Sequence, residues 1–174
     1  GRCRKSGDLG HFLTPTSACW LPESCCFAVS YTESRIVLFD SQTGIILGNQ
    51  YSNQPQHLKE IVERFQINKI TTGQNLLIAG TEDYKLRFID LNSNKVIKTV
   101  VGHADSVSCL QMLGQNLLMS GGHDGSVRTW DLRTFQLLND MSCHRRKYDE
   151  GTLAIGCSQG IVATGGADSI IKII

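Results

Sequence analysis

The residues best suited to chemistry lie together between Met119 and Asp131, in the segment MSGGHDGSVRTWD. Ser120, His123 and Asp124 are the residue types of a hydrolase triad, in which a histidine takes the serine proton and a carboxylate orients the imidazole. The segment has no G-x-S-x-G elbow, however, and Ser120 is bracketed by strand-forming residues. A structural use of these residues is therefore the stronger hypothesis, and a hydrolase stays open as the alternative.

The composition is that of a folded globular domain. The 174 residues include 41% hydrophobic and 19% charged residues, and the formal net charge is +1. A near-neutral chain gives no electrostatic reason to expect nucleic acid or an anionic membrane as a partner. No apolar run approaches the roughly 18 residues that span a bilayer, and no signal peptide is visible.

The seven cysteines argue against a disulfide scaffold. Their number is odd, and no C-x-x-C pair occurs that would indicate a zinc site. Most of them lie in apolar, strand-like runs, which predicts buried free thiols in a reducing compartment and hence a cytoplasmic protein. No cofactor or metal is predicted.

The chain repeats itself. Four copies of one pattern occupy residues 25–47, 71–100, 112–141 and 160–174. The closing aspartates of the first three copies are Asp40, Asp90 and Asp131, which gives steps of 50 and then 41 residues. A period near 41 is typical of a propeller-type array.

Each copy contains short strand-like runs separated by Gly, Asp and Asn turns. These runs predict an all-β fold: part of a β-propeller, with about four blades of four-stranded antiparallel sheet and a last blade that lacks its outer strand. The predicted blades are residues 14–50, 66–101, 102–142 and 143–174, preceded by a linker at 1–13. Residues 56–65, QHLKEIVERF, place apolar side chains on one helical face and predict an amphipathic helix inserted between blades.

The third copy resembles the WD repeat (WD40). Gly102 and His103 form the Gly-His pair, and the Trp130-Asp131 pair ends the repeat, with Trp130 standing 27 residues after His103. The resemblance implies a hydrogen-bonded network within the blade. The matching residues are His103 in the loop before the first strand, Ser120 in the second strand, Asp124 in the tight turn and Trp130 in the third strand. A buried network of this kind is stable only when every member is satisfied.

The other copies keep the turn but lack the full set of polar residues that forms the network of the third copy. The corresponding residues are Ala79, Asp83 and Ile89 in the second copy, Thr164, Asp168 and Ile174 in the fourth, and Ser34 and Phe39 in the first. A catalytic site does not explain why such copies retain their turns, whereas stacked sheets do. Four blades are fewer than the roughly seven of most WD-repeat propellers, so we expect either part of a longer propeller or association of copies through the open blade edges.

The tail resembles the C-terminal end of the striatin family. The segments CHRRKYDE and TGGADSIIKII carry the resemblance, together with TPTSACWLP, FQINKI and VGHADSVSCL, and it covers most of residues 14–174. Two departures are the short segment GTLAIGCSQG and the helix predicted at 56–65. Membership implies a scaffold that joins protein phosphatase 2A to Ste20-like kinases and adaptors. A ubiquitin-ligase substrate receptor and an RNA-associated propeller protein are the alternatives.

Propellers bind partners through the loops on their two faces. The candidate protein-binding residues on one such face are Glu33, Glu82, Asp105, His123, Arg145, Arg146 and Lys147. Solvated loop residues are the simpler interpretation of each. The basic run beginning at Arg145 is a weak footprint for RNA because Asp149 and Glu150 follow it directly.

Overall fold

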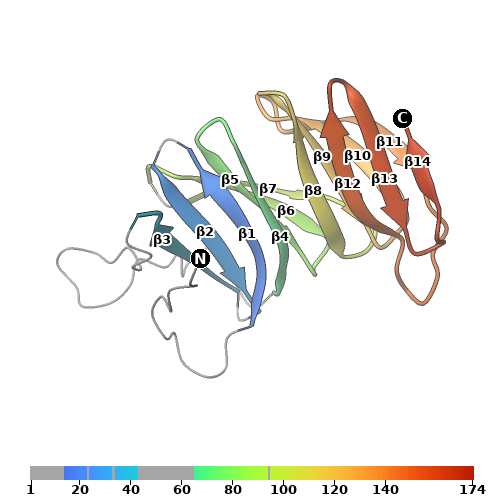
Figure 1. Cartoon of the computed structure of the whole chain (residues 1–174), viewed down its shortest axis with the longest axis horizontal. Helices are drawn as coiled ribbons and strands as arrows, with labels where there is room; N and C mark the ends of the chain where they lie inside the picture. The colour runs from blue at the N-terminus through green and yellow to red at the C-terminus, as the bar shows by residue number, and fades with distance from the viewer. Residues whose placement is uncertain (1–13, 23, 33, 43–64, 94) are drawn as a thin grey trace.

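The computed structural model describes residues 14–22, 24–32, 34–42, 65–93 and 95–174. Within these residues the chain forms fourteen strands in four antiparallel sheets, which follow one another from the N-terminal to the C-terminal end (Figure 1). The predicted all-β array of four blade-like sheets is thereby confirmed.

Each sheet is a meander of consecutive strands. The first sheet contains β1 (Pro15–Leu21), β2 (Cys26–Tyr31) and β3 (Arg35–Asp40). The second contains β4 (Ile67–Gly73), β5 (Leu76–Thr81), β6 (Lys85–Asp90) and β7 (Lys95–Val101). The third contains β8 (Val107–Leu113), β9 (Leu117–Gly122), β10 (Ser126–Asp131) and β11 (Gln136–Ser142). The fourth contains β12 (Thr152–Ser158), β13 (Ile161–Gly166) and β14 (Ile171–Ile173).

The fourth sheet stops after its third strand, as the sequence pattern predicts. The fourth strand expected for the first blade falls in residues 43–50, which lie outside the described residues. The linker at 1–13 also lies outside them, and so does the helix predicted at 56–65 apart from Phe65. The Phe65 carbonyl accepts a hydrogen bond from the Ser34 hydroxyl, and the Phe65 ring lies 5.8 Å from the guanidinium of Arg87.

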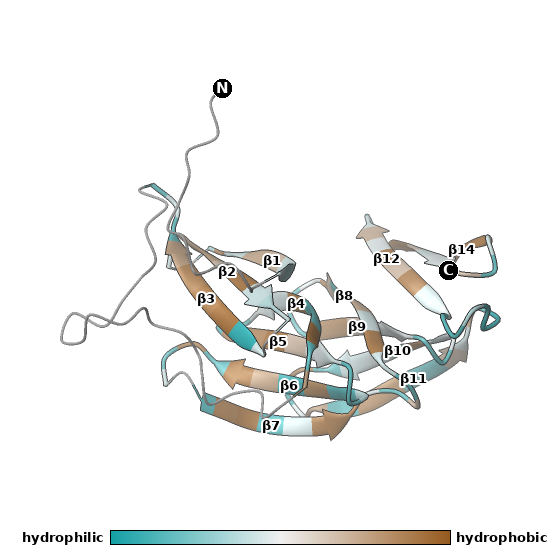
Figure 2. Ribbon diagram, turned by 90° about the horizontal axis from the view of Figure 1, so that it is seen from below, coloured by the Kyte–Doolittle hydropathy of each residue, from teal (hydrophilic) through white to brown (hydrophobic). Residues whose placement is uncertain are grey.

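Burial is greatest in the second and third strands of the second and third sheets and least in their outer strands. The first strands of the sheets, β1, β4, β8 and β12, lie next to one another along the concave side of the arc (Figure 2). Strand β5, with the continuous apolar sequence LLIAGT, is buried at every residue. The outer strand β7, with the mixed sequence KVIKTVV, is mostly exposed. Apolar runs therefore form the strands that have a sheet on both sides.

Three hydrophobic clusters join the sheets in pairs. The first cluster packs Ala28 and Ile36 against Leu77 and Ile89 of the second sheet. The second cluster packs the second sheet against the third, and the third cluster packs the third sheet against the fourth. Among the described residues the apolar core is therefore divided between successive sheets, and each sheet is stabilised by its neighbours.

The turn between the second and third strands is alike in all four sheets. One residue of each turn has a positive φ: Ser34 (60°), Tyr84 (69°), Gly125 (83°) and Ser169 (65°). Only Gly125 is a glycine, and a Cβ at this position would collide with the carbonyl oxygen of His144. A glycine is required there because the loop that leads to the next sheet passes directly over the turn.

Candidate functional site

Four of the predicted site residues meet in one buried hydrogen-bonded chain on the third sheet. His103 comes from the loop between β7 and β8, Ser120 from β9, Trp130 from β10, and Asp124 from the turn between β9 and β10. Ser120 Oγ lies 2.7 Å from His103 Nε2 and 2.9 Å from Trp130 Nε1. His103 Nδ1 lies 3.2 Å from Asp124 Oδ1.

The two end groups, together with a neutral imidazole, fix the donor at every step. An indole nitrogen can only donate, and a carboxylate can only accept. The Trp130 N–H therefore donates to Ser120 Oγ, and the Ser120 hydroxyl donates to His103 Nε2. The His103 Nδ1–H donates to Asp124. A neutral histidine with its proton on Nδ1 satisfies the whole chain.

The order Ser120–His103–Asp124 is also that of a hydrolase triad, but burial argues against catalysis. Ser120 is 0% exposed, and its oxygen already accepts the indole N–H of Trp130. No substrate can reach that oxygen unless the sheet opens. His123 lies outside the chain, because its Nδ1 is 2.9 Å from Ser106 Oγ. We propose that the network stabilises the third sheet.

Hydrogen bonds hold the Asp124 carboxylate ionised. Burial by itself raises the pKa of Asp124. Hydrogen bonds from the His103 side chain, the Ala104 N–H and both the hydroxyl and N–H of Ser126 outweigh burial, and they keep the pKa well below its ordinary value. The carboxylate thus ties the turn to the loop that precedes β8.

The second sheet stabilises the same turn without a histidine. Both oxygens of Asp83 accept hydrogen bonds of 2.7 Å from the Arg87 guanidinium, which reaches the turn from β6. The Thr81 hydroxyl also donates to Asp83. Burial raises the pKa of Asp83, but the bonds from Arg87, Thr81 and Lys85 outweigh it and lower the pKa strongly. Arg87 therefore replaces the histidine here, and the sequence pattern gave no sign of this.

The expectation that the fourth copy drops the polar set is wrong. His144 Nδ1 lies 3.0 Å from Asp168 Oδ1, and His144 Nε2 lies 3.0 Å from Thr164 Oγ1. This second network lacks only the tryptophan, because Ile174 stands at that position. The sequence signal was the pair Cys143-His144, which corresponds to Gly102-His103. It is easily missed because Thr152 stands eight positions after His144, whereas Val107 stands four positions after His103.

Two glycines make room for the two imidazoles. A Cβ on Gly122 would lie 2.6 Å from His103 Cγ, and a Cβ on Gly166 would collide with the ring of His144. Thr81 holds the equivalent position in the second sheet, where no imidazole lies over the strand. Glycine therefore occupies this strand position where a histidine ring packs over it. This is a steric reason for the last glycine of S-G-G in the third sheet and of T-G-G in the fourth sheet.

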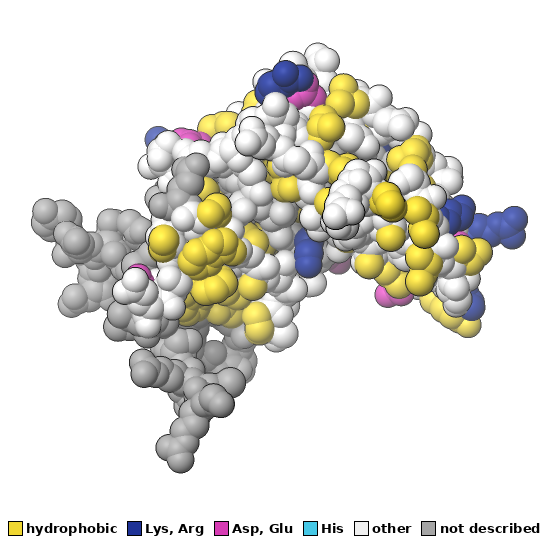
Figure 3. All heavy atoms as spheres, turned by 45° about the horizontal axis from the view of Figure 1, so that its top comes forward, with side chains coloured by type: hydrophobic (Ala, Val, Ile, Leu, Met, Phe, Trp, Pro, Cys, Tyr) yellow, Lys and Arg dark blue, Asp and Glu magenta, His cyan; other side chains and the backbone are white. Residues whose placement is uncertain are grey.

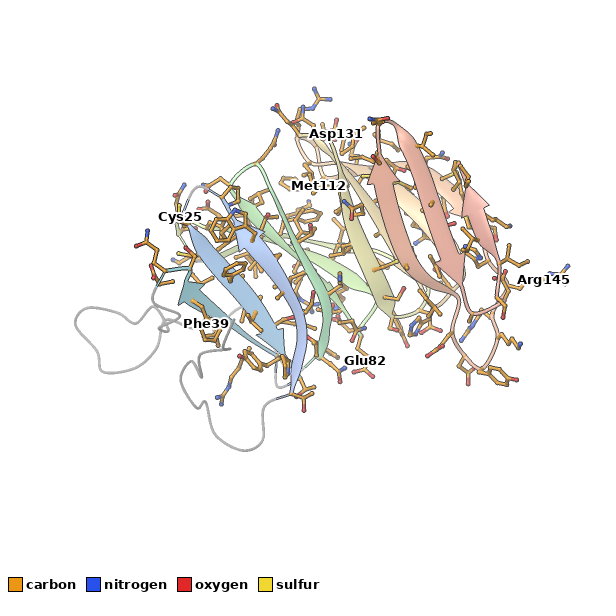
Figure 4. All side chains as sticks on the ribbon, in the orientation of Figure 1. Cys25, Phe39, Glu82, Met112, Asp131 and Arg145 are labelled. Carbon is orange, nitrogen blue, oxygen red and sulfur yellow. The ribbon has the colours of Figure 1, made fainter. Side chains whose placement is uncertain are left out.

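The candidate protein-binding residues lie at the ends of the sheets. Glu82 and His123 line one shallow hollow of about 420 Å³, together with side chains from β4, β8 and β12. Figure 4 shows Glu82 at the lower edge of the sheets and Asp131 at the upper edge. We call the edge with Glu82 the turn face. Glu33 lies outside the described residues.

The loop before β12 contributes the rest of the turn face. The Arg146 guanidinium pairs with Asp105 at 2.7 Å and lies 3.7 Å from Asp149, which leaves little net positive charge at this point. Arg145 donates its backbone N–H to Asp168, and Lys147 lies over the Tyr148 ring at 5.3 Å.

A tight turn forms the tip of that loop, and sequence reasoning missed its aromatic residue. Lys147 and Glu150 pair across the turn, and the two residues between them have positive φ angles, 54° for Tyr148 and 61° for Asp149. Two such residues in succession are typical of a type I′ turn, for which Asn-Gly is preferred. The Tyr148 side chain is exposed nonetheless. A strained, exposed aromatic residue is a candidate contact residue for a partner.

Two absences among the described residues bear on function. No group of three or more histidine, cysteine or acidic side chains is arranged to hold a metal ion in the part of the chain that the structure describes. In the same residues, no helix is long and apolar enough to cross a membrane.

Comparison with known proteins agrees with this geometry. The family model described as "WD domain, G-beta repeat" matches residues 94–131, which contain the complete network of the third sheet. A striatin homolog of Dictyostelium discoideum is 36% identical over 150 residues, covering 83% of this chain and 18% of that protein. Human Striatin-4 is 30% identical over 170 residues, covering 91% of this chain and 21% of that protein. The chain thus spans about a fifth of the length of these relatives.

Solved structures show the same fold. The computationally designed Ika4 protein superposes with a TM-score of 0.75 at 20% identity, covering 100% of this chain and 98% of that chain. U3-55K superposes with a TM-score of 0.76 at 19% identity, covering 94% of this chain and 49% of that chain. At these identities the likeness concerns the fold alone, which is that of a WD40 propeller.

Proposed function

Since the chain is a striatin-family WD-repeat protein, we propose that it is a non-enzymatic scaffold that binds other proteins through its turn face. The observation that carries this proposal is the contrast between the two kinds of polar residue. His103, Ser120 and Asp124 satisfy one another inside the sheet, whereas Glu82 and His123 line an open hollow. The buried set holds the turns rigid, and the exposed set is available to a partner.

The family resemblance suggests which partners to test. The striatin pattern implies protein phosphatase 2A, Ste20-like kinases and adaptor proteins. Tyr148 and Arg145 are the two residue types on this face that most often dominate protein interfaces. Tyr148 lies at the tip of the loop before β12 and Arg145 lies earlier in the same loop, and the exposure of both side chains supports a contact with a folded partner.

A reducing cytoplasmic location is part of the same proposal. The six described cysteines are free thiols. Burial raises the pKa of Cys19 to about 12 and that of Cys109 to about 11, so both thiols stay protonated and unreactive.

The test is capture of phosphatase 2A and Ste20-like kinases by the tagged chain, detected by immunoblot. The Arg145→Ala/Tyr148→Ala variant should capture at least tenfold less of the partner than the unaltered chain. The matched control is Arg133→Ala, an exposed arginine that follows Asp131 at the opposite edge of the sheet. Equal capture by both variants would contradict binding through the turn face. RNA in the captured complex that depends on Arg145 would instead support an RNA-associated protein.

A further inference from the structure

The hollow beside Glu82 on the turn face carries a negative charge in its wall. We call it the Glu82 hollow. Its wall also includes His123 and residues at or just before the start of β4, β8 and β12. Among the described residues, no lysine or arginine lines it. A cationic ligand therefore meets a carboxylate in this hollow, whereas an anionic ligand meets neither a lysine nor an arginine.

Glu82 differs from the aspartates near it because they are already paired. Three aspartates at the ends of the sheets each lie 2.7 or 2.8 Å from an arginine: Asp83 from Arg87, Asp105 from Arg146, and Asp131 from Arg133. At the edge opposite the turn face, Figure 3 shows basic and acidic side chains side by side. Glu82 is exposed and forms no ion pair with any other residue that the structure describes. Its charge is therefore free to bind a ligand.

The neutral groups of the Glu82 hollow offer hydrogen-bond acceptors. Asn68 Nδ2 donates to the Val107 carbonyl at 3.0 Å, which leaves Asn68 Oδ1 with a single long contact of 3.4 Å from Gln66 Nε2. The Ser108 hydroxyl donates to the Gly121 carbonyl at 3.0 Å, so its oxygen can only accept from a ligand. A carboxylate, an amide oxygen and a hydroxyl oxygen together favour a ligand with several N–H donors.

We propose that the Glu82 hollow binds an arginine side chain of a partner protein. A guanidinium is permanently charged and has five N–H donors in one plane, which matches a carboxylate surrounded by neutral acceptors. A lysine has only three donors on one compact charge and satisfies fewer of these acceptors. Leu153, which is 43% exposed, also lines the hollow and offers an apolar surface to the methylene groups of the arginine.

The Glu82 hollow adjoins the loop that we propose as a partner contact. Ser106 lines the hollow, and its neighbour Asp105 holds the Arg146 guanidinium of that loop at 2.7 Å. Leu153 stands only three positions after Glu150, at the other end of the loop. A protein seated on the loop therefore covers a surface that leads into the hollow. The inference rests on the proposed scaffold function and adds the chemistry by which the turn face selects a partner.

The first test compares two short peptides as ligands of the unaltered 174-residue chain. The probes are acetyl-Ala-Arg-Ala-amide and the same peptide with citrulline, which keeps the shape of arginine but has no charge. NMR titration follows the side-chain amide of Asn68 and the methyl groups of Leu153. The arginine peptide should shift these signals and bind about fivefold more tightly than the citrulline peptide. Equal affinities, or shifts confined to signals outside the hollow, would overturn the inference.

A third peptide, with lysine in place of arginine, tests the choice of side chain. It carries the same charge but fewer donors, so it should bind more weakly than the arginine peptide. A lysine peptide that binds as tightly as the arginine peptide would overturn the assignment of the hollow to arginine.

The second test removes the charge from the hollow and also adds to it. Glu82→Gln should weaken binding of the arginine peptide about fivefold and abolish its preference over the citrulline peptide. Gln66→Glu places a second carboxylate in the wall and should strengthen binding. The matched control is Glu150→Gln, which neutralises an exposed glutamate outside the hollow and should leave the affinity unchanged. All three positions are exposed or nearly so, and unchanged NMR signals elsewhere show that each variant is folded. Equal affinities of Glu82→Gln and the control would contradict the arginine site.

The arginine site and the proposed scaffold function fail separately. Suppose that the unaltered chain binds the arginine peptide through Glu82 but captures neither phosphatase 2A nor Ste20-like kinases. The proposed partners are then wrong, and the arginine site is retained. If capture depends on Tyr148 but Glu82→Gln leaves the peptide affinity unchanged, the scaffold function is retained and the arginine site is overturned.

Discussion

A histidine, a hydroxyl and an aspartate form the same buried chain in two sheets, through His103 in the third and His144 in the fourth. In the third sheet Trp130 adds a fourth member, whose N–H occupies the remaining acceptor position of Ser120. No buried side-chain nitrogen or oxygen of the described residues lacks a hydrogen-bond partner. Complete satisfaction explains how residues typical of catalysis can be buried at no net cost.

Removal of Asp124 should destabilise the chain strongly. Asp124→Ala leaves the N–H groups of Ala104 and Ser126 without their acceptor, and His103 Nδ1 keeps only Ser126 Oγ, at 2.9 Å, as a partner. We expect a loss of about 3 kcal/mol in the free energy of unfolding, measured by urea denaturation. Asp149→Ala, which alters an exposed carboxylate, serves as the control. A loss for Asp124→Ala no larger than that of the control would refute the structural role of the network.

Acid should weaken the same turns. The pKa of Asp124 is lower in the folded chain than in the unfolded chain, as are those of Asp83 and Asp168. The unfolded chain therefore takes up protons first, at an ordinary pKa near ~4. Stability is fully present above that pH and is lost as the pH falls further below it. The free energy of unfolding measured against pH should show this decline, and Asp124→Asn should make it shallower. An unchanged slope in the variant would contradict the assignment.

At the scale of elements, one turn is stabilised in two ways. In the third and fourth sheets the histidine comes from the loop before the first strand, and a glycine in the second strand leaves space for its ring. In the second sheet Arg87 comes from the third strand, and Thr81 replaces the glycine. The aspartate is common to all three turns because an acceptor is needed where the backbone reverses.

The steric link between glycine and histidine can be measured by a double-mutant cycle. Gly122→Ala places a methyl group against the His103 ring and should cost about 2 kcal/mol in the free energy of unfolding. In a His103→Ala background only Asp124 Oδ1, at 2.9 Å, stays close to the added methyl group, so the same change should cost less. The matched control is a His144→Ala background, which alters the equivalent ring in the other sheet. Equal costs of Gly122→Ala in all three backgrounds would exclude the proposed contact.

At the scale of the whole molecule, the apolar core of the described residues is divided among three clusters, each of which joins two successive sheets. The second and third sheets are therefore stabilised through both of their faces, and the stability of each sheet depends on its neighbours.

The all-β class, the four repeats and their turns follow from local pattern, because strand alternation and turn residues act within a few positions of the chain. The third-sheet network could also be anticipated from His103, Ser120, Asp124 and Trp130, since their spacing matches the WD repeat. The helix expected at 56–65 and the binding role of the turn face remain predictions.

Some contacts join residues whose spacing along the chain differs from that of the WD repeat, and only the tertiary structure reveals these contacts. The His144 network escaped notice because its loop is four residues longer than that of His103, and such a loop changes the spacing without changing the geometry. The role of Arg87 depends on the adjacency of β6 to the turn. Exposure of Ile171 depends on which sheets are present, because the same residue type in an internal sheet would be buried. Sequence determines which residues form strands, but only the packed sheets determine which of their faces remain open.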